Sequence, residues 1–169
     1  MLVTENSVWL KAQTVKLQVS EAILPEFDIG FDKRISKEMK EELRSFVKWV
    51  ESRYRIPITL LVDFEYNHYF ISRKGKRVGY LFYWADFSSY PVFDNKEEIP
   101  HIRLPVRTEH CTVAEILSSF IEAITDYYAW ICNELYESYV IDENEVEEIL
   151  QEYLTEKSEE KNAFPPKKR

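Results

Sequence analysis

Two long stretches of the chain repeat apolar residues at helical spacing. From Ser36 to Tyr54, apolar side chains recur every three or four residues between charged ones, which predicts an amphipathic helix with Ser36 as its N-cap. The same spacing continues for about six turns from Thr112 to Tyr139, and Thr112 and Glu115 spell a T-x-x-E capping box. We therefore expect the second helix to be the central helix of the core.

A third helix is predicted to begin at Asp142, because apolar residues again recur at helical spacing as far as Leu154. From about Thr155 onward the chain consists largely of Lys, Glu, Ser and Pro, a composition that buries little apolar surface. We therefore expect a single domain over residues 1–154, followed by a flexible charged tail over residues 155–169.

Short apolar runs predict the strands. Residues 15–19 alternate apolar and polar side chains, and Ile58–Phe64 is rich in Leu, Ile and Val. Tyr69–Ser72 and Val78–Trp84 flank a short polar segment with a glycine, which is typical of a hairpin. Ile102–Val106 alternates again, and its proline places it at an edge of the sheet.

The segments between these runs, residues 23–33 and 87–95, contain Pro, Gly, Asp and Asn and are expected to be connections. The predicted order is then strand, helix, three or four strands, and two helices. Strands grouped together with helices outside them are typical of the α+β class. We expect a small, three- to four-stranded, mainly antiparallel sheet packed by two or three helices.

The amino-acid composition excludes several classes of function. Asp and Glu number 30 against 22 Lys and Arg, and the resulting net charge of -8 argues against direct binding of nucleic acid. Three glycines are too few to spell a phosphate-binding loop, and two cysteines are too few for a disulfide framework. The sequence contains neither a long apolar run nor a basic leader, so we expect a cytoplasmic protein that does not bind membranes.

The most informative string is FIEAITDYYAW at residues 120–130, inside the predicted central helix. It resembles the metal-binding helix of small zincin-type metallopeptidases, in which an apolar run leads into H-E-x-x-H and then into aromatic residues. As architecture, the resemblance extends from Ser36 to Leu154. It implies a zincin-like core, in which two histidines would bind zinc and a glutamate would activate the bound water.

This chain does not retain the residues of that chemistry. Glu122 and Asp126 stand at the two histidine positions, and Ala123 stands at the position of the catalytic glutamate. Because alanine cannot accept a proton, the resemblance implies a scaffold without the hydrolytic mechanism. We therefore assign no catalytic residue and favour a protein that is not an enzyme.

What remains is a pair of carboxylates. Glu122 and Asp126 are four residues apart, so a helix places them on one face. The polar positions expected beside them are Ser118, Ser119, Thr125 and Asn133, and the candidate partners for an ion pair are Arg103 and Arg107.

Three functions remain open. The first is binding of another protein through a concave face formed by Ile102–Val106 and the polar strip. The second is a residual metal-binding protein or hydrolase, in which Glu122, Asp126 and Glu145 hold a divalent cation such as calcium, magnesium or manganese through oxygen ligands. The third is an acidic inhibitor of a nucleic-acid enzyme, of the kind made by phages or mobile elements. No other cofactor is implied, and a homo-oligomer is compatible with each function.

Overall fold

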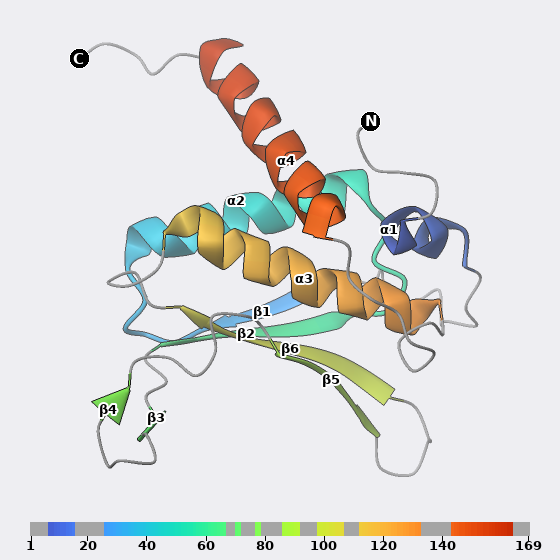
Figure 1. Ribbon diagram of the computed structural model, residues 1–169, viewed down its shortest axis with the longest axis horizontal. Coiled ribbons are helices and arrows are strands. Elements are labelled where there is room, and N and C mark those ends of the chain that lie inside the picture. The colour runs from blue at the N-terminus through green and yellow to red at the C-terminus, as the bar shows by residue number, and fades with distance from the viewer. Residues whose placement is uncertain are drawn as a thin grey trace.

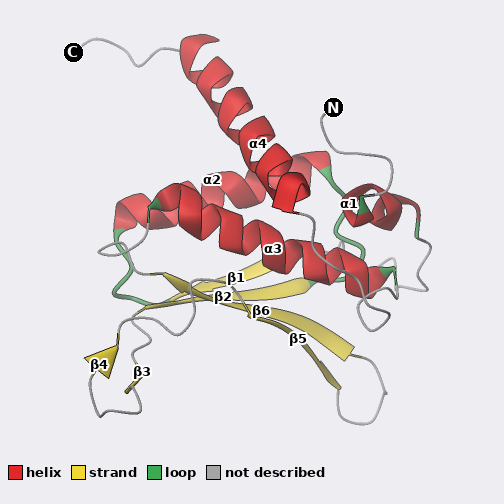
Figure 2. Ribbon diagram, in the orientation of Figure 1, coloured by secondary structure: helices red, strands yellow, loops and turns green. Residues whose placement is uncertain are grey.

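The computed structural model describes residues 7–15, 26–66, 70–71, 77–78, 86–91, 98–106, 112–132 and 143–163. Figures 1 and 2 show a sheet with the helices gathered on one of its faces. The helices are α1 (Val8–Lys11), followed by a 3-10 turn (Ala12–Thr14), α2 (Lys37–Arg53), α3 (Val113–Ile131) and α4 (Glu143–Ala163). The strands are β1 (Phe27–Phe31), β2 (Leu60–Tyr66), β3 (Phe70–Ile71), β4 (Arg77–Val78), β5 (Asp86–Pro91) and β6 (Glu98–Val106). The expected mixture of helices and strands is confirmed.

The main sheet has the strand order β1-β2-β6-β5. Strands β1, β2 and β6 run parallel to one another, and β5 runs antiparallel to β6. The prediction of a mainly antiparallel sheet is therefore wrong. The reason is that α2 connects β1 to β2, and a helical crossover returns the chain so that the two strands run in the same direction.

The prediction that Ile102–Val106 lies at an edge is also wrong, because β6 lies between β2 and β5. Within β6, Pro105 stands opposite Glu65 of β2, and the described pairing with β5 covers Glu98 to Arg103. Among the described strands, the edges of the sheet are β1 and β5.

Two strands fall in segments that the sequence analysis assigns to connections, namely β1 and β5. In β1 the misleading residue is Gly30, because glycine lowers strand propensity. The structure gives this glycine a packing reason: a Cβ atom at Gly30 would lie 2.8 Å from Oδ1 of Asp63 on the neighbouring strand. The predicted hairpin is confirmed in its paired part, where Phe70–Ile71 and Arg77–Val78 are antiparallel.

The beginnings of α2 and α3 agree with their sequence signals. The Ser36 hydroxyl accepts a hydrogen bond from the amide of Met39, and Thr112 and Glu115 form the complete capping box. Residues 16–19 of the first predicted strand, 133–139 of the predicted central helix and the predicted cap at Asp142 lie outside the described residues. The last helix continues beyond Leu154, where the sequence analysis starts the tail, and ends at Ala163.

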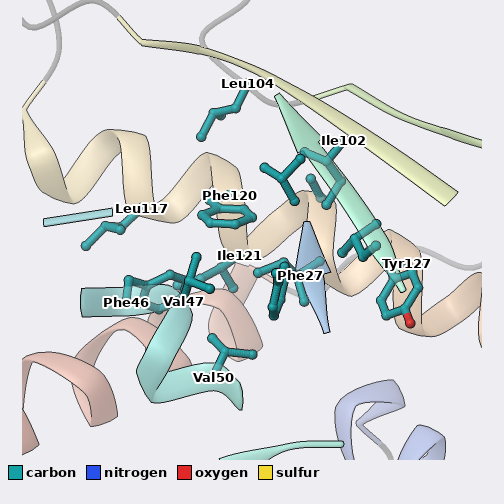
Figure 3. Close-up of a cluster of buried hydrophobic side chains, with 14 of the residues drawn as sticks. Phe27, Phe46, Val47, Val50, Ile102, Leu104, Leu117, Phe120, Ile121 and Tyr127 are labelled. Atoms are coloured by element: carbon teal, nitrogen blue, oxygen red, sulfur yellow. The ribbon is translucent and has the colours of Figure 1, made fainter. Parts of the chain in front are cut away.

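The core is built around α3, as expected. Phe120 is fully buried, and its ring lies 6.2 Å from that of Phe27, 5.6 Å from that of Phe46 and 5.3 Å from that of Phe64. One side chain of α3 thus contacts β1, α2 and β2 (Figure 3). From β6, Ile102, Leu104 and Val106 are buried with this cluster.

A short N-terminal segment ties three helices together. Trp9 of α1 is 0% exposed, and its ring lies 5.0 Å from each of the rings of Tyr54 and Tyr128. Its indole Nε1 donates a hydrogen bond to Thr125 of α3 at 2.8 Å. The hydroxyl of Ser7 donates a hydrogen bond to the Glu145 carboxylate in the first turn of α4. This segment therefore links the C-terminal end of α2 to α3 and α4.

Within the described ranges, none of the helices combines the length and the apolar character needed to cross a lipid bilayer.

Replacing Trp9 is expected to destabilise the whole domain. Trp9→Ala removes a fully buried indole and should lower the free energy of unfolding by about 3–5 kcal/mol in urea denaturation. Thr125→Val keeps the packing and removes the acceptor of the indole N–H, so a loss of about 1–3 kcal/mol is expected. A Trp9→Ala loss below about 1 kcal/mol would show that α1 is not part of the cooperative core.

The cap of α3 gives a second stability test. Thr112→Ala removes the hydroxyl that accepts from the Glu115 amide and should cost about 1 kcal/mol of unfolding free energy. Thr112→Ser keeps that acceptor and should unfold within a few tenths of a kcal/mol of the wild type. Equal losses in the two variants, measured by chemical denaturation, would contradict a role for the hydroxyl.

Candidate functional site

The buried surface of α3 leaves one row of side chains partly accessible. Between Ile116 and Ile131, every side chain of α3 is buried except those of Ser118, Glu122, Asp126 and Trp130. These residues are four apart, so they follow one another along the helix. We call this row the acidic lane. Of the expected polar strip, Ser118 lies in this row with Glu122 and Asp126, Ser119 and Thr125 are buried, and Asn133 lies outside the described residues.

The acidic lane points away from the sheet. An α-helix turns by about 100° per residue, so Glu122 lies about 200° around α3 from Phe120, which packs on β1 and β2. In Figure 1, α1 and α4 lie on this far side of α3, and both helices contact it. The lane therefore belongs to the helical layer and does not face a strand.

Arg103 does not form the predicted ion pair with Glu122 and Asp126. It is on the opposite face of β6 from the buried residues Ile102 and Leu104, and its guanidinium donates to both carboxylate oxygens of Glu65, at 2.9 and 3.0 Å. The proposed concave face, with Ile102–Val106 beside the acidic lane, is therefore wrong. The physical reason is the two-residue period of a strand, which buries half of β6 and turns the other half away from α3. Arg107 lies outside the described residues.

A charged surface that was not predicted from the sequence lies on that outer face of the sheet. His101 Nε2 lies 2.6 Å from Asp63 Oδ2, next to the pair formed by Arg103 and Glu65. The signal for it was present, since Asp63 and Glu65 alternate with the core residues of β2. What the alternation does not reveal is the register, which sets Asp63 opposite Arg103.

Two buried tyrosines anchor the C-terminal half of α3, the helix that carries the acidic lane. The hydroxyl of Tyr127 accepts from the amide of Ile58 at 3.0 Å and donates to the carbonyl of the same residue. The hydroxyl of Tyr128 donates to the carbonyl of Arg55 at 3.0 Å. Burial raises the pKa of both phenols, so both stay neutral donors at physiological pH. These bonds fix the rotation of α3 and thereby the direction of the lane.

The remaining member of the predicted metal set lies on another helix. Glu145 is in the first turn of α4, is buried and accepts the hydrogen bond from Ser7. Glu122, Asp126 and Glu145 also interact with other groups of the protein. In the part of the chain that the structure describes, no group of three or more His, Cys, Asp or Glu side chains is arranged to hold a metal ion. Metal binding by these three carboxylates stays a prediction.

The chemistry that the acidic lane offers is recognition of positive charge. Glu122 and Asp126 present two acceptors one turn apart, and Trp130 adds an aromatic surface one turn further along. Ala123, which follows Glu122 on α3, is 1% exposed and does not contribute to this surface.

Comparisons with protein-family models, with curated proteins and with solved structures find no match to this chain, so its fold and its acidic lane are interpreted from their own geometry.

Proposed function

We propose that this chain is a non-hydrolytic binding protein built on a zincin-like scaffold, and that its acidic lane recognises a basic segment of another protein. The observation that carries this proposal is the placement of Glu122 and Asp126. Between Ile116 and Ile131 only four side chains of α3 are partly accessible, and two of them, Glu122 and Asp126, are carboxylates at the positions that would hold zinc ligands.

The order of elements supports the scaffold. The resemblance calls for a helix, several strands with a hairpin, an edge strand and then a capped helix. The chain has α2, the β3–β4 hairpin, the antiparallel edge strand β5, and then α3 with its capping box, although the central strand β6 separates β5 from α3. The edge strand of this scaffold is thus β5, in place of the segment that the sequence suggested.

The chemistry of the acidic lane favours Arg and Lys as the groups it binds. Two carboxylates one turn apart match the fork of a guanidinium, and such charge-assisted hydrogen bonds are stronger than neutral ones. Trp130 provides an aromatic ring on which the same cation or its aliphatic stem would pack. The net charge of -8 adds long-range attraction for a basic partner.

A basic probe tests the proposed recognition. A short fluorescein-labelled peptide of alternating Arg and Ser is expected to bind the wild-type chain in fluorescence polarisation, and its Glu-for-Arg counterpart is not. Replacing both lane carboxylates, as Glu122→Gln with Asp126→Asn, should weaken binding about tenfold or more, because the charge-assisted contacts are lost.

The matched control removes two negative charges elsewhere. Glu159 and Glu160 are exposed on α4, and Glu159→Gln with Glu160→Gln changes the net charge by the same amount as the lane variant. This control should bind the peptide within about twofold of the wild type. Equal weakening by both variants would mean that the peptide senses only net charge, and the acidic lane would then not be the binding site.

The scaffold assignment has its own test. The triple variant Glu122→His, Ala123→Glu, Asp126→His rebuilds H-E-x-x-H on α3 and should bind one equivalent of zinc, because two imidazoles one turn apart then share the lane. Glu122→His alone is the control and should bind zinc about a hundredfold more weakly, since it supplies one histidine in place of two. Zinc titration of a folded triple variant that gives no stoichiometric binding would contradict the zincin-like geometry.

A further inference from the structure

A second acidic feature runs along α4, outside the acidic lane. Glu145, Glu148, Glu152 and Glu156 recur at three- and four-residue steps and therefore share one flank of the helix. We call them the α4 carboxylate row. This flank faces the C-terminal end of α2, where Arg53 contacts both Glu152, at 3.2 Å, and Glu156.

Neutral groups and one guanidinium donate to the carboxylates of the α4 carboxylate row. Glu145 accepts from the hydroxyl of Ser7, and Glu156 accepts from the indole of Trp49 as well as from Arg53. Ser7 and Trp49 are neutral. Within the described part of the chain, Glu148, Glu152 and Glu156 therefore have one guanidinium, that of Arg53, among their contacts.

Three buried oxygen atoms in this region have no hydrogen-bond partner among the described residues: Oε2 of Glu148, Oε2 of Glu152 and the hydroxyl of Tyr54. Tyr54 is only 3% exposed and Glu152 only 8% exposed, so bulk water does not solvate these two groups. A buried carboxylate oxygen without a partner is costly, and such atoms are rare in folded proteins. Their presence beside the row indicates a missing electropositive group.

The Tyr54 hydroxyl is affected electrostatically by the α4 carboxylate row. Burial raises the pKa of the Tyr54 hydroxyl to about 12, and the carboxylate of Glu152 is the next largest cause. The phenol is therefore neutral at physiological pH and leaves the negative charge of Glu152 in place. Its oxygen keeps two lone pairs that a cation, or a water molecule bound to one, would use.

We propose that Glu148 and Glu152, with the hydroxyl of Tyr54 beside them, form a binding site for one hard divalent cation of the class of Ca²⁺, Mn²⁺ and Mg²⁺. All the unpaired atoms are oxygens, which these ions prefer over nitrogen and sulfur ligands. Arg53 holds Oε1 of Glu152 and leaves Oε2 to the ion. Water would complete the coordination, as is common where a protein supplies only two carboxylates.

This site would join the end of α2 to α4. Tyr54 follows directly after α2, whereas both carboxylates come from α4. Binding of the cation should therefore stabilise the folded chain. The inference is independent of the proposed function, because it uses none of the residues of the acidic lane.

Isothermal titration calorimetry of the full chain with CaCl₂, MnCl₂ and MgCl₂, after treatment with a chelator, tests the site. At least one of the three ions should bind with a stoichiometry of one and raise the melting temperature. Glu148→Gln with Glu152→Gln should weaken binding by about tenfold or more. Without the ion, this variant should melt at or above the temperature of the wild type, because it removes buried like charges.

Two further variants keep the test decisive. Tyr54→Phe preserves the buried ring and should fold, but it should lower the affinity for the ion by about two- to fivefold. Glu159→Gln with Glu160→Gln, the exposed pair on the same helix, should bind the ion like the wild type. The proposal is overturned if none of the three ions binds, if the Glu148 and Glu152 variant binds unchanged, or if Glu122→Gln with Asp126→Asn abolishes binding instead.

Discussion

Burial of α3 between the sheet and the other helices determines which of its side chains stay accessible and in which direction they point. Phe120 packs against aromatic rings from β1, α2 and β2, and the tyrosines at the other end of α3 bind the backbone that follows α2. A helix fixed at both ends has little freedom to rotate. The few side chains it leaves partly accessible are therefore held in one direction, which is a requirement for any binding site.

Local signals predicted where α2 and α3 begin. The capping box of Thr112 and Glu115 and the N-cap at Ser36 depend on residues three positions apart, and both are present in the structure. The four-residue spacing of Glu122 and Asp126 also sufficed to place them on one partly accessible face. Ser119 shows the limit of this reasoning, because it adjoins the lane in sequence and is nevertheless buried.

The sheet was harder to predict because its order depends on contacts between distant segments. Strand β1 carries Asp28 and Gly30, which oppose strand formation locally, and becomes a strand through pairing with β2. Pro105 indicated an edge, whereas the pairing of β6 with both β2 and β5 makes it a central strand. The predicted ion pair of Arg103 with Glu122 and Asp126 is wrong for the same reason, because the register of β2 and β6 brings Arg103 to Glu65.

The N-terminal segment connects two acidic helices through neutral hydrogen-bond donors. The acidic lane of α3 and the α4 carboxylate row place negative charge on two helices in contact, and like charges in a partly buried setting repel more strongly than in water. Ser7 and Trp9 act on both helices: one donates to Glu145, and the other donates to Thr125, next to Asp126. Because both donors are neutral, they add hydrogen bonds without adding a charge. The N-terminal segment therefore joins α3 and α4 through two neutral hydrogen-bond donors.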